Sequence, residues 1–429
     1  MQAQLLSILH DQVKPAFGCT EPVACALAVA RAREELGSPE SVESIKVVCS
    51  PGVYKNGLGV GIPGTGESGI PIAVALGALI GRSEQGLEVL ASVTPEAVKQ
   101  AQKMLEQGIV EVTFDPSSSG VYVQATVSGA KGYVQAIISG SHTNIIYIEK
   151  NGQPLYGSDS RETAAASTDA SSPKAMSALN IPDLVHFIET VPLAKIAFLQ
   201  DGARMNQEAA QEGLSKNAGH GVGHTLKNLM DQGIISSDMA TKARIYTAAA
   251  SDARMGGLPI AIMSSAGSGN HGIEAIVPVT VVWEELNLPE EKLIRALALS
   301  HLVTVYIKEH TGKISPICGC SVAAGAGASA ACTWLLGGDA AAVGRAVQNI
   351  IASLAGILCD GGKNGCALKL AATATEAVLA AQLAIRGISA DQLDGIVGKT
   401  PEQTIANLGY VSAHGLGQTD AAILSVMKS

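Results

Sequence analysis

The sequence predicts an α+β protein: a large, mostly helical domain plus a smaller α+β domain with a mixed or antiparallel sheet. Three observations favour this fold class. Segments typical of strands fall almost entirely between residues 44 and 157. Ala-rich segments typical of helices follow one another from residue 181 onward. Aromatic residues make up only 3% of a chain with 47 glycines, which favours closely packed helices over an aromatic-rich barrel or sandwich.

Residues 1–43 read as helical, with Thr20 as a predicted N-cap ahead of Glu21 and Pro22. We expect these N-terminal helices to dock on the helical domain. The small domain, residues 44–157, should contain one strand-helix-strand crossover followed by a meander. Strands are predicted over 44–48, 110–114, 121–127, 133–138 and 144–149, with a helix over 70–80 and a turn at 151–152.

Residues 158–180 are rich in Ser, Thr, Ala and Asp and are interpreted as a linker. Residues 181–429 form the predicted helical domain, in which the β-branched run 276–283 is the one strand candidate. Helices are predicted over 182–214, 223–232, 289–308, 316–336, 341–358 and 367–385.

Composition excludes several classes of protein. The formal charge of −9 argues against a general nucleic-acid binder, which needs a basic face. The N-terminus lacks the features of a secretory signal. The uncharged stretch 314–338 is too rich in Gly, Ala and Ser for a membrane span. We therefore expect a cytoplasmic protein whose eight cysteines are reduced.

Cysteines at helix ends are the first candidates for chemistry. Cys19, Cys318 and Cys366 lie at predicted helix starts, where the helix dipole favours the thiolate that binds metals. Cys359 ends the preceding helix ahead of a Gly-rich loop, so four thiols could converge on one ion or cluster. The spacing matches neither ferredoxins nor zinc fingers, and buried structural cysteines remain the alternative. Core positions are expected for Cys25, Cys49 and Cys332.

A Gly-rich loop spans residues 57–69 and follows Lys55 and Asn56. Pro63 and the late helix start argue against a dinucleotide fingerprint. The loop either brings backbone amides close to an anionic substrate or is a plain flexible turn. His142, between two strands, is a candidate base or a structural loop histidine. His220 and His224 lie among glycines and lack a carboxylate at a metalloprotease spacing, which disfavours a zinc site.

Two polar segments interrupt the apolar C-terminal half, residues 251–257 and 265–272. Arg254 offers a bidentate fork for a carboxylate, and Asn270 could orient an amine or carboxylate. Because a buried charge needs a partner, an Asp252–Arg254 pair is the alternative interpretation.

Taken in order, these segments resemble the L-cysteine desulfidase family, which is related to the alpha chain of iron–sulfur L-serine dehydratases. The resemblance runs from residue 14 to beyond 410 and ends with SAHGLGQTD. Its segments are KPAFGCTEP (14–22), KNGLGVGIPGTG (55–66), GSHTN (140–144), SDARMGG (251–257), SAGSGNHG (265–272), SPICG (315–319) and CDGGKNGCALK (359–369).

The resemblance implies an oxygen-sensitive [4Fe–4S] cluster and no pyridoxal phosphate. It implies that Cys318, Cys359 and Cys366 are the cluster ligands, with Cys19 a displaceable fourth ligand or an active-site thiol. Cys320 is not part of the family pattern.

The implied reaction is α,β-elimination of L-cysteine to sulfide, ammonia and pyruvate. Cys19 or His142 would be the base, and Arg254 and Lys55 would hold the substrate carboxylate, with Asn56 and Asn270 orienting it. Ser251, in the same segment as Arg254, is a further candidate contact. The Gly-rich loop would close over the site.

Two other functions remain open, an L-serine dehydratase and a non-catalytic iron–sulfur sensor. The expected partner is a small amino acid, without nucleic acid or membrane. The apolar, small-residue helices favour a homodimer.

Overall fold

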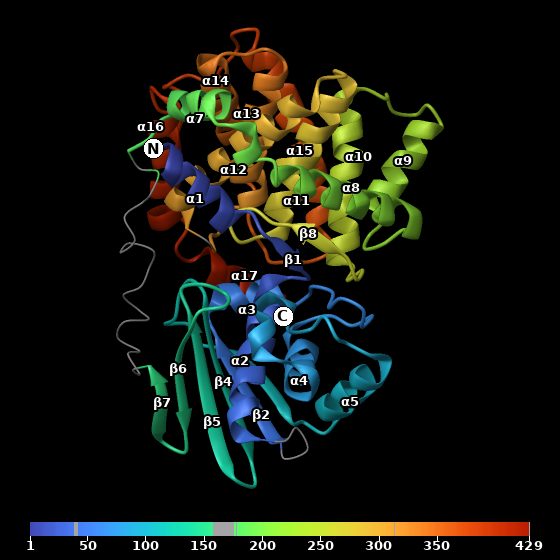
Figure 1. Ribbon diagram of the computed structural model, residues 1–429, viewed down its shortest axis with the longest axis vertical. Coiled ribbons are helices and arrows are strands. Elements are labelled where there is room, and N and C mark those ends of the chain that lie inside the picture. The colour runs from blue at the N-terminus through green and yellow to red at the C-terminus, as the bar shows by residue number, and fades with distance from the viewer. Residues whose placement is uncertain (38–41, 158–175, 177, 313, 429) are drawn as a thin grey trace.

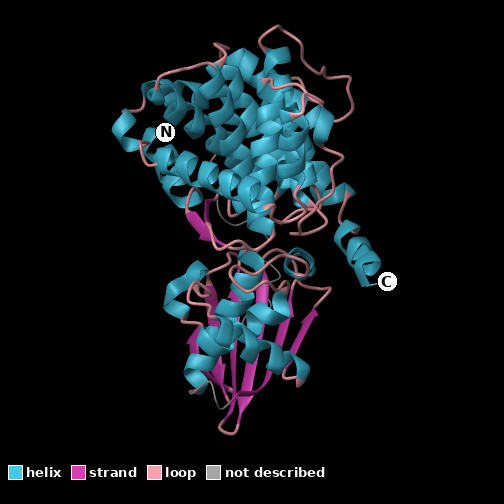
Figure 2. Cartoon of the chain, turned by 90° about the vertical axis from the view of Figure 1, so that its right-hand side faces the viewer, coloured by secondary structure: helices cyan, strands magenta, loops and turns pink. Residues whose placement is uncertain are grey.

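The computed structural model describes residues 1–429 except 38–41, 158–175, 177, 313 and 429. A helical unit stacks on a smaller unit built around a sheet (Figure 1; Figure 2). The predicted α+β fold class is confirmed. Most of the predicted linker, 158–180, lies outside the described residues.

The small unit contains a six-stranded mixed sheet with strand order β3-β2-β4-β5-β6-β7. β2 and β3 are parallel, and the other neighbours are antiparallel, which confirms the predicted crossover followed by a meander. Asn151 and Gly152 both have positive φ and form the turn between β6 and β7. The strands are β2 (Val42–Cys49), β3 (Val110–Phe114), β4 (Tyr122–Gly129), β5 (Gly132–Ser139), β6 (Ile145–Lys150) and β7 (Gln153–Gly157).

The two N-terminal helices pack on different units. α1 (Gln2–Gln12) buries Leu5 and Leu9 in the helical core, as expected. The expectation is wrong for α2 (Thr20–Leu36), which packs on β4, β5 and α4 (Ile70–Ile80). Its Ala-rich sequence is apolar on most sides, so it can be enclosed between sheet and helix. The sheet unit also contains α3 (Pro51–Gly57) and α5 (Pro95–Glu106).

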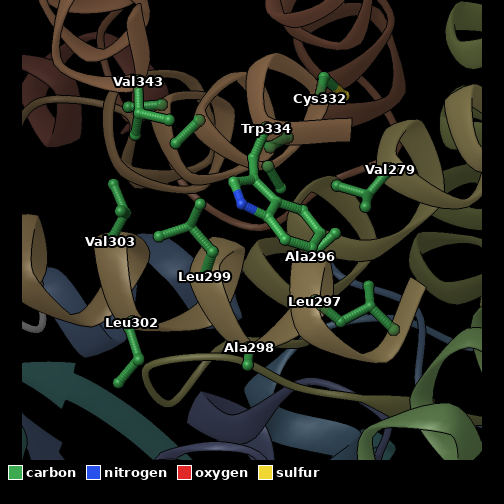
Figure 3. Packing of buried hydrophobic residues seen from close by; sticks show 14 of the residues in the cluster. Val279, Ala296, Leu297, Ala298, Leu299, Leu302, Val303, Cys332, Trp334 and Val343 are labelled. Atoms are coloured by element: carbon green, nitrogen blue, oxygen red, sulfur yellow. The ribbon is translucent and has the colours of Figure 1, made fainter. Parts of the chain in front are cut away.

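The helical unit encloses the larger core. Figure 3 shows the indole of Trp334 among Val279 and Ala296. The strand predicted over 276–283 is wrong, because this run lies within α11 (Gly269–Glu285), where nearly every side chain is buried. Helix packing on all sides overrides the strand preference of β-branched residues. The longer helices are α8 (Leu199–Lys216), α10 (Met239–Met255), α12 (Glu290–Thr311), α13 (Gly325–Leu335), α14 (Ala340–Leu354) and α15 (Cys366–Ala384).

Several element boundaries also differ from the prediction. The helix predicted over 182–214 is divided, because Pro192 follows α7 (Ile181–Thr190) and precedes α8. Two short strands, β1 (Pro15–Phe17) and β8 (Ala261–Met263), were not predicted and pair antiparallel. The remaining α-helices are α9 (Val222–Asp231), α16 (Pro401–Tyr410) and α17 (Thr419–Lys428). Short 3₁₀ helices lie at Ser83–Glu88 and Leu193–Lys195, and short π-helical segments lie at Cys320–Ala324 and Val411–Gly415.

Among the described residues, one helix, α15, is long and apolar enough to cross a membrane, and half of that stretch is buried in the protein. The earlier uncharged stretch contains the buried helix α13, as expected.

Candidate active site

A cavity of about 100 Å³ lies where the two units meet. Residues of the sheet unit and of the helical unit both line it. A larger open groove of about 890 Å³ lies on α8 and α11, but none of the cysteines lines it. The smaller cavity is therefore the better candidate site. Its polar lining residues include Cys19, Glu21, Asn56, His142, Arg254, Asn270, His271, Lys308, Cys318, Cys320, Cys359, Asp360, Cys366 and Lys369.

Backbone pairing brings Cys318 and Cys359 together. The amide of Cys318 donates to the carbonyl of Ile357 at 2.8 Å, and the amide of Cys359 donates to that of Pro316 at 2.7 Å. An antiparallel bridge between Ile317 and Leu358 results. Two expected helix ends are corrected here: the helix after Pro316 begins only beyond Cys318, and α14 ends before Cys359. Cys359 thus lies in a loop.

Cys366 is the first residue of α15, as predicted, and it lies between Cys19 and the pair Cys318 and Cys320. It packs against Cys19 and Val60 on one side and against the cluster that contains Cys318 and Cys320 on the other. Its backbone amide donates to the carbonyl of Lys363 at 2.9 Å, which fixes the turn at the end of the Gly-rich segment. The four predicted cysteines therefore share one cavity.

The expectation that helix N-termini favour thiolates holds for only one of these cysteines. The hydrogen bond from Cys320 is the main cause that lowers the pKa of Cys318 to about 6, with a contribution from Ser321 and against the effect of burial. Burial raises the pKa of Cys366 to about 11, and it also raises the pKa values of Cys359 and Cys19. A bound metal would act in the opposite direction, because metal ions deprotonate coordinating thiols.

Glu21 joins the start of α2 to α3. Its Oε2 accepts from the Cys19 thiol at 3.1 Å and from the Thr20 hydroxyl at 3.0 Å, while its Oε1 accepts from the Asn56 amide at 2.9 Å. Burial alone would raise the pKa of Glu21, but the charge of His142 and the bonds from Asn56 and Cys19 lower it to about 2. Glu21 is therefore an ionised carboxylate next to His142.

His142 reaches the cavity from the loop between β5 and β6. The loop is fixed at its base, because the Asn144 side chain donates to the carbonyl of Ser139 at 2.9 Å. His142 is the one cavity-lining residue from this part of the sheet unit. A histidine near a buried carboxylate is an arrangement suited to general-base chemistry.

Arg254 ends α10 and is buried against the helical unit. It donates to Oδ1 of Asn270 at 3.1 Å and to the carbonyl of Gly18 at 3.0 Å. Its Nε is buried and has no hydrogen-bond partner among the described residues. The alternative pairing with Asp252 is wrong, because that carboxylate accepts from the amides of His220 and Gly223 at the start of α9.

Two predicted site residues do not line the cavity. Lys55 is fully buried and donates to the Cys359 carbonyl and to Asp420, both at 2.6 Å. Its ammonium is therefore engaged with two groups of the protein itself. Ser251 is also fully buried, within α10, and lies outside the cavity lining. His224 bonds to the Leu214 carbonyl rather than to a metal ligand set.

The Gly-rich loop 57–69 uses its backbone amides within the protein. The amide of Gly61 donates to the Met255 carbonyl at 3.1 Å, and that of Gly64 donates to the Gly257 carbonyl at 3.2 Å. A Cβ on Gly61 would overlap the backbone of Gly257, so glycine is needed for this close approach. The loop is a contact between the two units, and it does not line the cavity.

Some cavity residues were missed in the sequence. Glu21 lies two residues after Cys19 in the GCTEP segment, and this proximity could have indicated that Glu21 lies in the same site. His271 follows Asn270 directly, and burial followed by the charge of Lys308 lowers its pKa to about 3. Lys308 lies in the last turn of the long helix α12. No motif around it in the sequence indicates that it lines a cavity.

The cysteines fit an iron–sulfur cluster better than a single ion. Within the described part of the chain, no three His, Cys, Asp or Glu side chains are close enough to hold one metal ion. A cluster distributes its thiolates over several irons, and thiols are its usual ligands. Cys318, Cys359 and Cys366 line one cavity, and Cys19, which packs near Cys366, supplies a fourth thiol to it.

The comparison with known families supports a class of protein, an enzyme of the lyase type. The sequence model of the serine dehydratase alpha chain family matches residues 84–425, and the chain belongs to this family. That family is generally iron–sulfur dependent.

Relatives extend over almost the whole chain. A UPF0597 protein of Clostridioides difficile is 41% identical over 98% of both chains. One of Desulfatibacillum aliphaticivorans is 42% identical over 98% of this chain and 97% of its own, and one of Bacteroides fragilis is 40% identical over 99% and 97%. Their names state no activity.

Proposed function

We propose that this protein is an iron–sulfur-dependent L-cysteine desulfidase, a lyase that converts L-cysteine and water to hydrogen sulfide, ammonia and pyruvate. The observation that supports it is the shared cavity of Cys19, Cys318, Cys359 and Cys366. Four thiols from distant segments meet there beside a buried arginine and a carboxylate–histidine pair.

Cys318, Cys359 and Cys366 are the residues that would hold a [4Fe–4S] cluster. When bound, such a cluster supplies a Lewis-acidic iron for the leaving sulfur of the substrate. Cys318 is the cysteine best prepared for this role, because hydrogen bonds from Cys320 and Ser321 already favour its thiolate. Lys369 adds a positive charge close to these thiolates.

Arg254 and Asn270 bind the substrate carboxylate in this proposal. Arg254 is held in place by the carbonyl of Gly18 and the side chain of Asn270, and its buried Nε retains an unused donor. A carboxylate that bonds to this edge would satisfy the donor and neutralise the buried charge. In this proposal the Cα of the bound amino acid lies toward His142, which lines the same cavity.

His142 in its neutral form removes the proton from Cα, and the nearby Glu21 carboxylate stabilises the imidazolium that this transfer forms. Breaking the C–H bond leaves an electron pair that forms the double bond to Cβ while the C–S bond breaks. The His142 imidazolium then gives its proton to the leaving hydrosulfide, so the products of this step are 2-aminoacrylate and hydrogen sulfide. Tautomerisation to the imine and hydrolysis by water then yield pyruvate and ammonia. Cys19, whose thiol is hydrogen-bonded to Glu21, is the alternative base.

L-Serine is the second candidate substrate, and the family match favours it. The same residues would bind it, and a hydroxyl would leave in place of the thiol. A sensor without catalysis would produce no pyruvate from either amino acid.

Anaerobic reconstitution with iron and sulfide, followed by pyruvate and sulfide assays on both amino acids, tests these alternatives. We expect the larger kcat/KM with L-cysteine and equal amounts of pyruvate and sulfide. A larger value with L-serine would replace the desulfidase proposal with the dehydratase. Absence of pyruvate from both, in protein that carries the cluster, would reject a lyase.

A further inference from the structure

Lys55 connects three segments that are distant in the sequence. Its ammonium is fully buried and donates at 2.6 Å both to the carbonyl of Cys359 and to Oδ1 of Asp420, which is 365 residues away. Asp420 lies in the first turn of α17, and its side chain is 25% exposed. Figure 1 shows α17 at the level where the two units meet, close to α3.

We propose that Asp420 and Lys55 form a lock that holds the Cys359 loop in position for cluster binding, so that the C-terminal helix controls cluster retention. This inference rests on the proposed function for its cluster and extends that function to α17. Lys55 and Asp420 act as positioning residues, because neither lines the cavity.

The backbone of the loop also lies directly against α3. The amide of Gly362 donates to the Asn56 carbonyl at 3.2 Å. A Cβ on Gly361, which has a φ of +102°, would overlap the Lys55 carbonyl. The loop therefore contacts α3 through both main chain and the Lys55 side chain.

Charge explains why Asp420 is needed in this arrangement. A buried ammonium without a carboxylate partner is strongly unfavourable, whereas a neutral side chain of similar size is tolerated. If Asp420 leaves, Lys55 keeps only one neutral carbonyl partner. The lysine would then turn toward water and release the carbonyl of Cys359. Cys359, whose carbonyl Lys55 holds, and Asn56, which follows Lys55 in the chain, would then lose their fixed positions together.

The lock is tested first in metal-free protein, by the rate at which iodoacetamide alkylates Cys359, followed by peptide mass spectrometry. Asp420→Asn should raise this rate about tenfold or more, because it leaves the buried charge unpaired. Asp420→Glu should restore a slow rate. Asp231→Asn, which removes an exposed ion pair with Lys227, is the matched control and should leave the rate unchanged.

A double variant, Lys55→Met with Asp420→Asn, separates the lock from general stability. It removes the buried charge pair, so its thermal unfolding should resemble that of the original protein, yet Cys359 should still react quickly. In reconstituted protein, both Asp420→Asn and the double variant should lose iron to a chelator about tenfold faster than the control. Unchanged alkylation in Asp420→Asn would overturn the lock. Failure of the original protein to bind a cluster would reject the proposed function, while the alkylation result would still stand.

Discussion

The side-chain amide of Asn56 donates to Oε1 of Glu21 at 2.9 Å and so joins the end of α3 to the start of α2. The same carboxylate accepts from Cys19 through its other oxygen. Asn56 was expected to orient the substrate, and the structure shows it orienting a carboxylate of the protein. Glu21 in turn carries the charge that faces His142.

Glu21 should make the stability of the metal-free protein depend on pH in acid. Its pKa is about 2 in the folded chain against an ordinary value of 4.5. Its stabilising contribution is therefore complete above pH 4.5 and is lost as the pH falls toward 2. Between pH 4.5 and 3, we expect Glu21→Gln to reduce the slope of unfolding free energy against pH by about 1 kcal/mol per pH unit on average, below the limit of about 1.4 for one full proton. Urea unfolding at several pH values measures this slope, and equal slopes would contradict the assignment.

His142→Ala should reduce turnover about 10²–10⁴-fold, which is the usual contribution of a general base. The visible spectrum of the cluster should not change, because His142 is not one of the residues proposed to hold it. Steady-state kinetics on L-cysteine and L-serine measure the loss. His186→Ala, a surface histidine on α7, is the control. Undiminished turnover would remove His142 from the mechanism and leave Cys19 as the base.

Replacing a cluster ligand should prevent reconstitution. Cys318→Ser, Cys359→Ser and Cys366→Ser should each bind less iron and lose the visible absorption of the cluster, because thiolates are its ligands. Cys332→Ala, in the helical core, is the control for loss of a buried cysteine. Iron and sulfide analysis per chain gives the measurement. If Cys320→Ser also abolishes binding while Cys318→Ser does not, the ligand assignment moves to Cys320.

Arg254→Lys should raise KM for the amino acid more than it lowers kcat. Lysine keeps the charge but loses the planar fork, and one hydrogen bond to a charged group is worth about 1.5–3 kcal/mol. The expected loss in kcat/KM is therefore about 10- to 150-fold. Arg244→Lys tests an exposed arginine on the same helix and should have no effect. An unchanged KM would place the substrate carboxylate elsewhere.

Local sequence patterns determined much of this protein. Alternation over residues 121–127 and the Asn-Gly pair at 151–152 located strands and a hairpin, because these patterns act on neighbouring backbone. The ordered segments with Cys19, Cys318, Cys359 and Cys366 indicated the family, since each residue type carries its chemistry wherever it lies. The roles assigned to these cysteines and to Arg254 remain predictions that the experiments above test.

Only the tertiary structure decided which groups meet. It placed α2 on the sheet, enclosed the β-branched run 276–283 as a helix, and used the amides of the Gly-rich loop within the protein. It also buried Lys55 outside the cavity lining and paired it with Asp420, 365 residues later in the chain. The physical reason is that burial and long-range partners set the charge and position of a side chain, and a local pattern contains neither.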